Sequence, residues 1–143
     1  MRTRTLQERA PRSWMLVFDA GDDFQETLLA FAREKEIAGA TFSAIGTFQH
    51  ATLGYWDLER KEYLHIDMPE QVEVCSLTGN VARSPQGEPK VHAHAVIGRR
   101  DGSTRAGHVV SARVRPTLEL VLTETPEPLT RRLHPALGLA LLD

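Results

Sequence analysis

Two histidines one residue apart are the feature of this sequence best suited to chemistry. His92 and His94 lie in the segment KVHAHAVI, residues 90–97, which largely alternates in character. On a β-strand, side chains two residues apart point to the same face and lie about 6.5–7 Å apart. Two imidazoles in that arrangement can bind one metal ion, because imidazole is the commonest metal ligand in proteins. A pair of polar residues on a solvent-facing strand is the alternative interpretation.

The turn between two expected strands decides whether His108 joins this pair. A two-residue hairpin loop, 101–102, would direct His108 to the opposite face of the sheet. A three-residue loop, 100–102, with Gly102 in the left-handed conformation of a β-bulge, would place His108 directly opposite His94. Glycine at that position favours the second arrangement. Three histidines would then converge, which is the ligand count of a zinc site whose fourth position is open to water or substrate.

Other candidate residues are weaker. Glu73 is a candidate proton carrier beside such a metal, and Glu119 could serve in the same way, although an exposed carboxylate is the simpler interpretation of each. Cys75 is two residues from Glu73, and its apolar neighbours predict a buried, unreactive thiol. The chain has no phosphate-binding glycine loop and no GxSxG nucleophile motif. Three histidines lack a companion at ligand spacing and are expected on or near the surface: His50, His65 and His134.

Composition narrows the class of protein. The chain has 143 residues, of which 41% are hydrophobic and 25% charged, as is typical of a globular domain. Its formal net charge of −2 gives no basic footprint for non-specific nucleic-acid binding. Five arginines around the expected hairpin could still form a local basic patch: Arg99, Arg100, Arg105, Arg113 and Arg115. A single cysteine excludes an internal disulfide. The sequence has no apolar stretch of signal-peptide type or of membrane-spanning length. We therefore expect a cytoplasmic protein with no membrane partner.

One helix is expected near the N-terminus, after a flexible segment over residues 1–12 and a short buried strand over 13–20. Asp23 can accept hydrogen bonds from the first free N–H groups, and Glu26 follows three residues later, as in a capping box. Apolar residues then recur at helical spacing, and Gly39 is the expected end of the helix.

Short β-branched or aromatic segments fill the rest of the chain and are separated by turns. A single helix followed by consecutive strands predicts an α+β fold, with a mostly antiparallel sheet and the one main helix packed on it. The apolar end of the tail, residues 137–142, is expected to be buried at a subunit contact. The expected strands cover residues 41–45, 50–57, 63–68, 71–81, 90–99, 104–115 and 117–124.

Taken together, these segments resemble one family. The resemblance runs from about residue 14 to about residue 133, and the order of its elements is more specific than any one of them. The chain is similar to the plants-and-prokaryotes conserved (PPC) domain, which plant nuclear proteins carry fused to AT-hook motifs. The matching segments are AIGTF (44–48), ATLGYWD (51–57), VEVCSLTG (72–79), PKVHAH (89–94), DG (101–102), AGHV (106–109) and TLELV (117–121).

The resemblance implies an α+β fold assembled as a homotrimer, with the PPC-like domain over residues 13–133 and a C-terminal tail over 134–143. It also implies that His92, His94 and His108 hold Zn²⁺ or a similar divalent metal. The chain lacks the Arg-Gly-Arg-Pro hook that enters the minor groove, since its N-terminal arginines are scattered: Arg2, Arg4, Arg9 and Arg12.

Two functions follow. The first is a regulatory protein that binds DNA or another protein, with the metal in a structural or sensory role. The second is a metal-dependent enzyme, or a binder or sensor of small molecules, that uses the open coordination position of the metal. Whether the chain catalyses a reaction, and on which substrate, is left open by the sequence.

Overall fold

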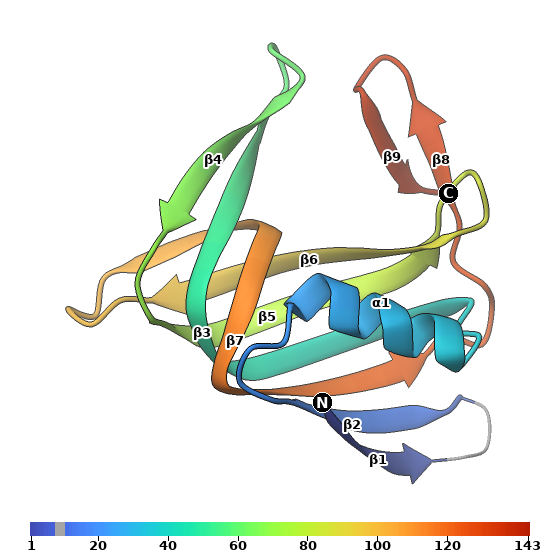
Figure 1. Cartoon of the computed structure of the whole chain (residues 1–143). Helices are drawn as coiled ribbons and strands as arrows, with labels where there is room; N and C mark the ends of the chain where they lie inside the picture. The colour runs from blue at the N-terminus through green and yellow to red at the C-terminus, as the bar shows by residue number, and fades with distance from the viewer. Residues whose placement is uncertain (8–10) are drawn as a thin grey trace.

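The structure is a computed structural model that describes residues 1–7 and 11–143. Figure 1 shows one helix, α1, lying across a strongly bent antiparallel sheet, with one hairpin of that sheet and a separate two-stranded hairpin extending away from the helix. This is the α+β architecture expected from the sequence. The elements of the described residues are β1 (Arg2–Gln7), β2 (Ser13–Phe18), α1 (Phe24–Glu34), β3 (Gly39–Asp57), β4 (Glu62–Met68), β5 (Val72–Arg83), β6 (Pro89–Gly98), β7 (Thr104–Glu124), β8 (Arg131–His134) and β9 (Leu139–Leu142).

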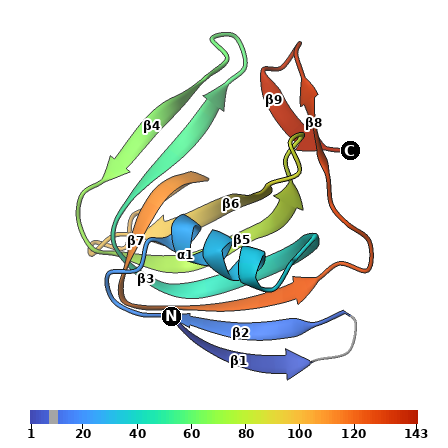
Figure 2. The same ribbon diagram turned by 45° about the vertical axis from the view of Figure 1, so that its right-hand side comes forward.

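The main sheet closes on itself. Its seven strands run in the order β1-β2-β7-β6-β5-β3-β4, and β7 pairs in addition with β3, so that β3, β5, β6 and β7 form a ring. Strands β8 and β9 make a separate two-stranded sheet. Seen after a 45° turn, the β3–β4 hairpin and the β8–β9 hairpin stand on the same side of this ring (Figure 2). The ring fixes the strand positions that the candidate site uses.

Strands β3 and β7 are each continuous, although the sequence predicts a break in both. Residues 41–45 and 50–57 belong to one strand, because Gly46 lets β3 bend without leaving the sheet. Gly46 has a φ of +147°, and a Cβ there would lie 2.5 Å from the carbonyl oxygen of Thr117. Only glycine allows this close approach to β7.

Helix α1 begins where the sequence predicts and ends earlier. The Asp23 side chain accepts hydrogen bonds from the backbone N–H groups of Gln25 and Glu26, at 3.1 and 3.0 Å. The helix ends at a cap on Lys35, followed by Glu36 with a φ of +54°. Gly39 is therefore not the end signal. It begins β3, where a Cβ would lie 2.5 Å from Oγ1 of Thr125, so the glycine is required by packing.

The hydrophobic core lies between α1 and the ring of strands. Phe24 on the helix contacts Phe42 and Phe48 of β3, with both ring centroids 6.2 Å away. Each such ring stabilises the fold by about 1.5–3 kcal/mol through burial. The helix buries four side chains in this core: Phe24, Leu28, Phe31 and Ala32.

Both ends of the chain have regular structure. The N-terminal segment that we expected to be flexible contains β1, whose backbone pairs with β2; residues 8–10 of that segment lie outside the described residues. The apolar tail forms β9 against β8, with Leu137 and Leu142 remaining 39% and 44% exposed. Its burial at a subunit contact stays a prediction. No helix in the described part of the chain is long and apolar enough to cross a membrane.

Candidate metal centre

The loop between β6 and β7 is the three-residue form. The backbone N–H of Arg99 donates to the carbonyl of Ser103 at 2.8 Å, which leaves residues 100–102 as the loop. Gly102 has a φ of +81°, the left-handed conformation expected there. This register makes His94 and His108 direct partners across β6 and β7, which confirms the arrangement that the glycine favoured.

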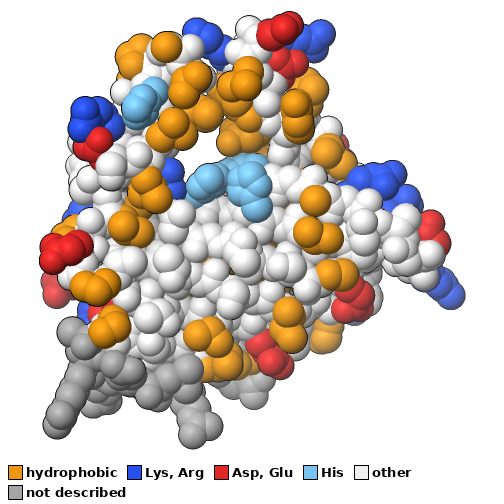
Figure 3. All heavy atoms as spheres, turned by 180° about the vertical axis from the view of Figure 1, so that it is seen from behind, with side chains coloured by type: hydrophobic (Ala, Val, Ile, Leu, Met, Phe, Trp, Pro, Cys, Tyr) orange, Lys and Arg blue, Asp and Glu red, His pale blue; other side chains and the backbone are white. Residues whose placement is uncertain are grey.

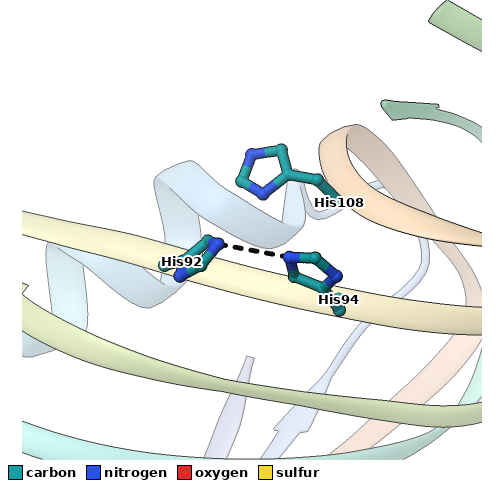
Figure 4. Close-up of side chains that lie close together, drawn as sticks. All are labelled: His92, His94 and His108. Atoms are coloured by element: carbon teal, nitrogen blue, oxygen red, sulfur yellow. Dashed lines mark hydrogen bonds between the residues drawn. The ribbon is translucent and has the colours of Figure 1, made fainter. Parts of the chain in front are cut away.

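The three predicted histidines converge. His92 and His94 share one face of β6, and His108 faces them from β7, with ring centroids 5.1 to 5.6 Å apart. One ring nitrogen from each lies within 4.8 Å of the others. Figure 4 shows ring nitrogens of all three residues turned toward a common space. No other group of three His, Cys, Asp or Glu residues in the described part of the chain has this spacing.

The distances suit a small cation. Nε2 of His92 and Nε2 of His94 are 3.2 Å apart. Two nitrogens bound to one tetrahedral zinc ion at 2.0–2.1 Å lie about 3.3 Å apart, so this edge of the cluster already has the required length. Nδ1 of His108 is buried and has no hydrogen-bond partner in the protein, which leaves its lone pair free for a metal.

Burial favours the neutral form of His92 and His108. Burial, together with the smaller effects of the charges of His92, His94 and Arg131, lowers the pKa of His108 from 6.5 to about 4. Burial, followed by the charges of Arg131 and His94, also lowers the pKa of His92. Neutral imidazole is the form that ligates a metal, so at pH 7 these side chains are in the ligating state.

An aromatic wall backs His108. The ring of Tyr63 stacks on the His108 ring at 4.9 Å and 21°, and Trp56 packs edge-on against Tyr63 at 4.9 Å. Tyr63 can lie there because Gly54 on β3 has no side chain, since a Cβ would be 2.7 Å from Cδ1 of Tyr63. Nε1 of Trp56 is buried without a hydrogen-bond partner in the protein. Sequence reasoning missed this wall, although Gly54 lies in the quoted ATLGYWD segment.

An arginine from the tail completes the surroundings. Arg131 on β8 donates from Nη2 to Oδ1 of Asn80 at 2.6 Å. Asn80 is the direct strand partner of His92 across β5 and β6. Residue spacing predicted neither Arg131 nor Asn80 at the site, because β8 belongs to a separate sheet whose position depends on contacts distant in the chain. In Figure 3 histidine side chains form the floor of a hollow between two arms that carry hydrophobic side chains.

The structure does not bring Glu73 to the histidines. Glu73 lies opposite Gly98 at the other end of β5, where it accepts a 3.3 Å hydrogen bond from Thr47. Thr78, the partner of His94, is five residues further along the strand, about 16 Å away. Glu73 is therefore not positioned as a proton carrier for this cluster, and exposed Glu119 is likewise outside it.

Cys75 is exposed, so the prediction of a buried thiol is wrong. The register of β5 with β6 shifts between Val74 and Ser76, which marks a bulge at Cys75. A bulge breaks the alternation of faces along a strand, and the buried position passes from Val74 to Leu77.

The five arginines do not form one patch. Arg105 pairs with Ile97 near the hairpin tip, whereas Arg113 pairs with His50 on β3 and donates to the carbonyl of Gly21 at 2.8 Å. Arg105 and Arg113 are eight residues apart, which corresponds to about 26 Å along β7. The hairpin end itself carries three arginines, of which one is neutralised by Glu70 at 2.6 Å: Arg99, Arg100 and Arg105.

Comparison with known families identifies the chain. The Plants and Prokaryotes Conserved (PCC) domain, abbreviated PPC above, matches residues 6–126. The chain belongs to this family. The match includes the complete β6–β7 hairpin and all three histidines, so the candidate metal centre lies inside the PCC domain itself. A search of curated proteins found no match.

Solved structures show the same PCC fold. A protein from Bacteroides thetaiotaomicron, named as a proposed DNA-binding protein, is 28% identical with a TM-score of 0.89, over 99% of this chain and 96% of its own. A plant- and prokaryote-conserved protein from Pyrococcus horikoshii is 30% identical with a TM-score of 0.86. The alignment covers 98% of this chain and 94% of the Pyrococcus horikoshii chain. A metal-containing protein from Archaeoglobus fulgidus is 31% identical with a TM-score of 0.84. The alignment covers 99% of this chain and 98% of the Archaeoglobus fulgidus chain.

Proposed function

We propose that this PCC-domain protein binds a zinc-type divalent ion through His92, His94 and His108. The observation that carries the proposal is the convergence of three imidazole nitrogens within 4.8 Å on the β6–β7 hairpin. The lowered pKa values of His92 and His108 and the unpartnered Nδ1 of His108 support it. The similarity to the metal-containing protein from Archaeoglobus fulgidus, at 31% identity, is consistent with the same proposal.

A zinc ion held by three imidazoles retains an open position, where it acts as a Lewis acid or binds a ligand atom. The chain's own residues set the rest of the site. Tyr63 stacks on His108 and fixes the orientation of that ring. Because Glu73 and Glu119 do not reach the cluster, the geometry favours a metal-dependent small-molecule binder or sensor over a hydrolase that needs a carboxylate base.

Metal analysis of tag-free protein tests the proposal. We expect about one zinc-type ion per chain in the wild type and none in a His92→Ala/His94→Ala variant. A His50→Ala/His65→Ala variant is the matched control, since both of its histidines are exposed and outside the cluster. Equal metal content in the wild type and the His92→Ala/His94→Ala variant would overturn the proposal.

We also propose the homotrimer that the resemblance implies. Three apolar side chains on the outer surface of the ring support an interface between copies, because exposed apolar side chains on neighbouring strands are unfavourable in a monomer. These side chains are Ile45 on β3, which is 60% exposed, Val96 on β6, which is 40% exposed, and Val121 on β7, which is 37% exposed.

DNA binding is the second candidate function. It rests on the similarity to the Bacteroides thetaiotaomicron protein and on the arginines at the hairpin end. Opposing it are the net charge of −2 and the pairing of Arg99 with Glu70. A gel shift on random and A/T-rich duplexes at low and moderate salt tests it. An Arg100→Ala/Arg105→Ala variant should lose any shift, and absence of binding by the wild type at low salt would exclude this function.

A further inference from the structure

Arg131 carries a charge that the protein does not neutralise. Its side chain is half-buried, and its two hydrogen bonds go to neutral oxygens: Oδ1 of Asn80 at 2.6 Å and the carbonyl of Ala140 at 3.2 Å. Among the described residues, no Asp or Glu forms an ion pair with it. Burial lowers the pKa of Arg131, as expected for a cation removed from water without a counter-charge. Such an arrangement is costly unless an anion is bound there.

The unpaired guanidinium belongs to the histidine cluster. Asn80, which holds it, is the direct strand partner of His92. Direct partners of neighbouring strands point to the same face of a sheet, so Asn80 holds the guanidinium of Arg131, at 2.6 Å, on the face of the sheet that carries His92. Among the described residues, no ion pair joins a carboxylate to any of the three histidines.

The charge balance then defines the ligand. Imidazole ligates a metal in its neutral form, so a divalent ion bound by the three histidines would add two positive charges beside the guanidinium. Nothing in the described surroundings compensates for these charges, and a bound anion would be attracted by both. A guanidinium has five N–H donors, of which Arg131 uses two in its contacts with the protein. The remaining donors suit the paired oxygens of an oxyanion.

The walls favour an organic ligand. Tyr63 and Trp56 present aromatic surface beside His108, and burial raises the pKa of Tyr63, which keeps its hydroxyl uncharged. Aromatic and apolar walls around a few convergent polar groups are typical of small-molecule sites. An inorganic anion would leave this surface uncovered.

We propose that Arg131 is an anion-binding residue of the histidine site, and that the ligand of this site is a small organic carboxylate. The inference rests on the proposed metal binding and adds the class of ligand. In this arrangement Arg131 binds the carboxylate, Asn80 positions Arg131, and the aromatic wall contacts the apolar part of the ligand.

Titration of Co²⁺-loaded protein with sodium butyrate tests the inference, because the visible absorption of bound cobalt changes when an anion enters its coordination sphere. Calorimetric titration of the same samples gives an independent affinity. We expect Arg131→Met to weaken butyrate binding about tenfold or more through loss of a charge-assisted contact. Arg132→Met is the matched control, since the exposed neighbour Arg132 pairs with Asp143, and its affinity should equal that of the wild type.

Two further measurements keep the test decisive if Arg131→Met folds poorly. Asn80→Asp retains Arg131 and supplies a carboxylate beside it, so we expect weaker butyrate binding in a protein of normal fold. Inorganic phosphate serves as the competing probe and should bind less tightly than butyrate. Tighter binding of phosphate would overturn the assignment to a carboxylate.

Cobalt content separates the two possible failures. Wild-type protein that holds no cobalt would overturn both the proposed function and this inference. Full cobalt content, with butyrate affinities of Arg131→Met and Asn80→Asp within about twofold of the wild type, would overturn the inference alone.

Discussion

Replacing Gly54 by alanine should dislodge the aromatic wall of the site. A Cβ at this position would lie 2.7 Å from Cδ1 of Tyr63 and 3.0 Å from Cγ2 of Val110. Real Cβ atoms almost never lie closer than 3.0 Å to a heavy atom of a distant residue. The Tyr63 ring must therefore shift from its present position, which disturbs its stacking on His108 at 4.9 Å. Gly54 does not have a positive φ, so the backbone itself would accept alanine.

The magnitude follows from two losses. Overpacking of this kind costs about 1–3 kcal/mol. Loss of the ring stack adds about 0.5–1.5 kcal/mol. We expect the free energy of unfolding of metal-free Gly54→Ala to fall by about 2 kcal/mol, measured by urea denaturation. In a domain of this size the melting temperature would fall by about 6 °C.

Two variants show whether Tyr63 is the cause. Gly98→Ala is the matched control. A Cβ there would lie 3.1 Å from the thiol of Cys75, which is exposed and can rotate away, so the free energy of unfolding should fall by less than in Gly54→Ala. In a Tyr63→Ala background, Gly54→Ala should cost much less than in the wild type. An equal cost in both backgrounds would refute the reasoning, as would wild-type stability of Gly54→Ala itself.

Three further outcomes are expected. Arg12 donates to Glu124 from two nitrogens, at 2.7 and 2.5 Å, and these bonds lower the pKa of Glu124. This pair therefore stabilises the fold above the unfolded pKa of glutamate, near 4.5, and the contribution is lost as the pH falls through the lower folded value. Urea denaturation should show that Arg12→Met has a free energy of unfolding about 1 kcal/mol below that of the wild type at pH 7, and nearly the same free energy of unfolding at pH 2. Asp23→Ala should destabilise the fold by about 1 kcal/mol through loss of the helix cap. Asp23→Ser should retain most of the stability that the cap contributes. Ile45→Asp should reduce the mass measured by light scattering from that of a trimer toward that of a monomer, and an unchanged mass would contradict the proposed interface.

The histidine geometry was predictable because its determinants are local. Alternation along β6 places His92 and His94 on one face, and Gly102 selects the loop that places His108 opposite His94. The helix start at Asp23 was predictable for the same reason, since a cap depends only on the next three residues. Each of these predictions required only residues that are close in the sequence.

The remainder of the site depends on contacts that are distant in the chain. Arg131 approaches His92 because β8 lies beside β5, and Tyr63 approaches His108 because β3 pairs with both β4 and β7. No local pattern encodes those pairings. The error at Cys75 has a local origin, because one bulge in β5 changes which residues face outward. Assigning faces by counting alternate residues fails wherever a strand contains an extra residue.

The closed ring of strands also has a consequence for the order of folding. All three histidines lie on one hairpin, between residues 92 and 108, so the loop that brings them together is short and loses little chain entropy on closure. Gly54, Tyr63 and Arg131 reach them only through long-range pairing, which forms more slowly. An ion could therefore be captured by the nascent hairpin before β3 and β7 join. Metal added during refolding would then accelerate assembly by acting as a template, while the groups that select a ligand would arrive last.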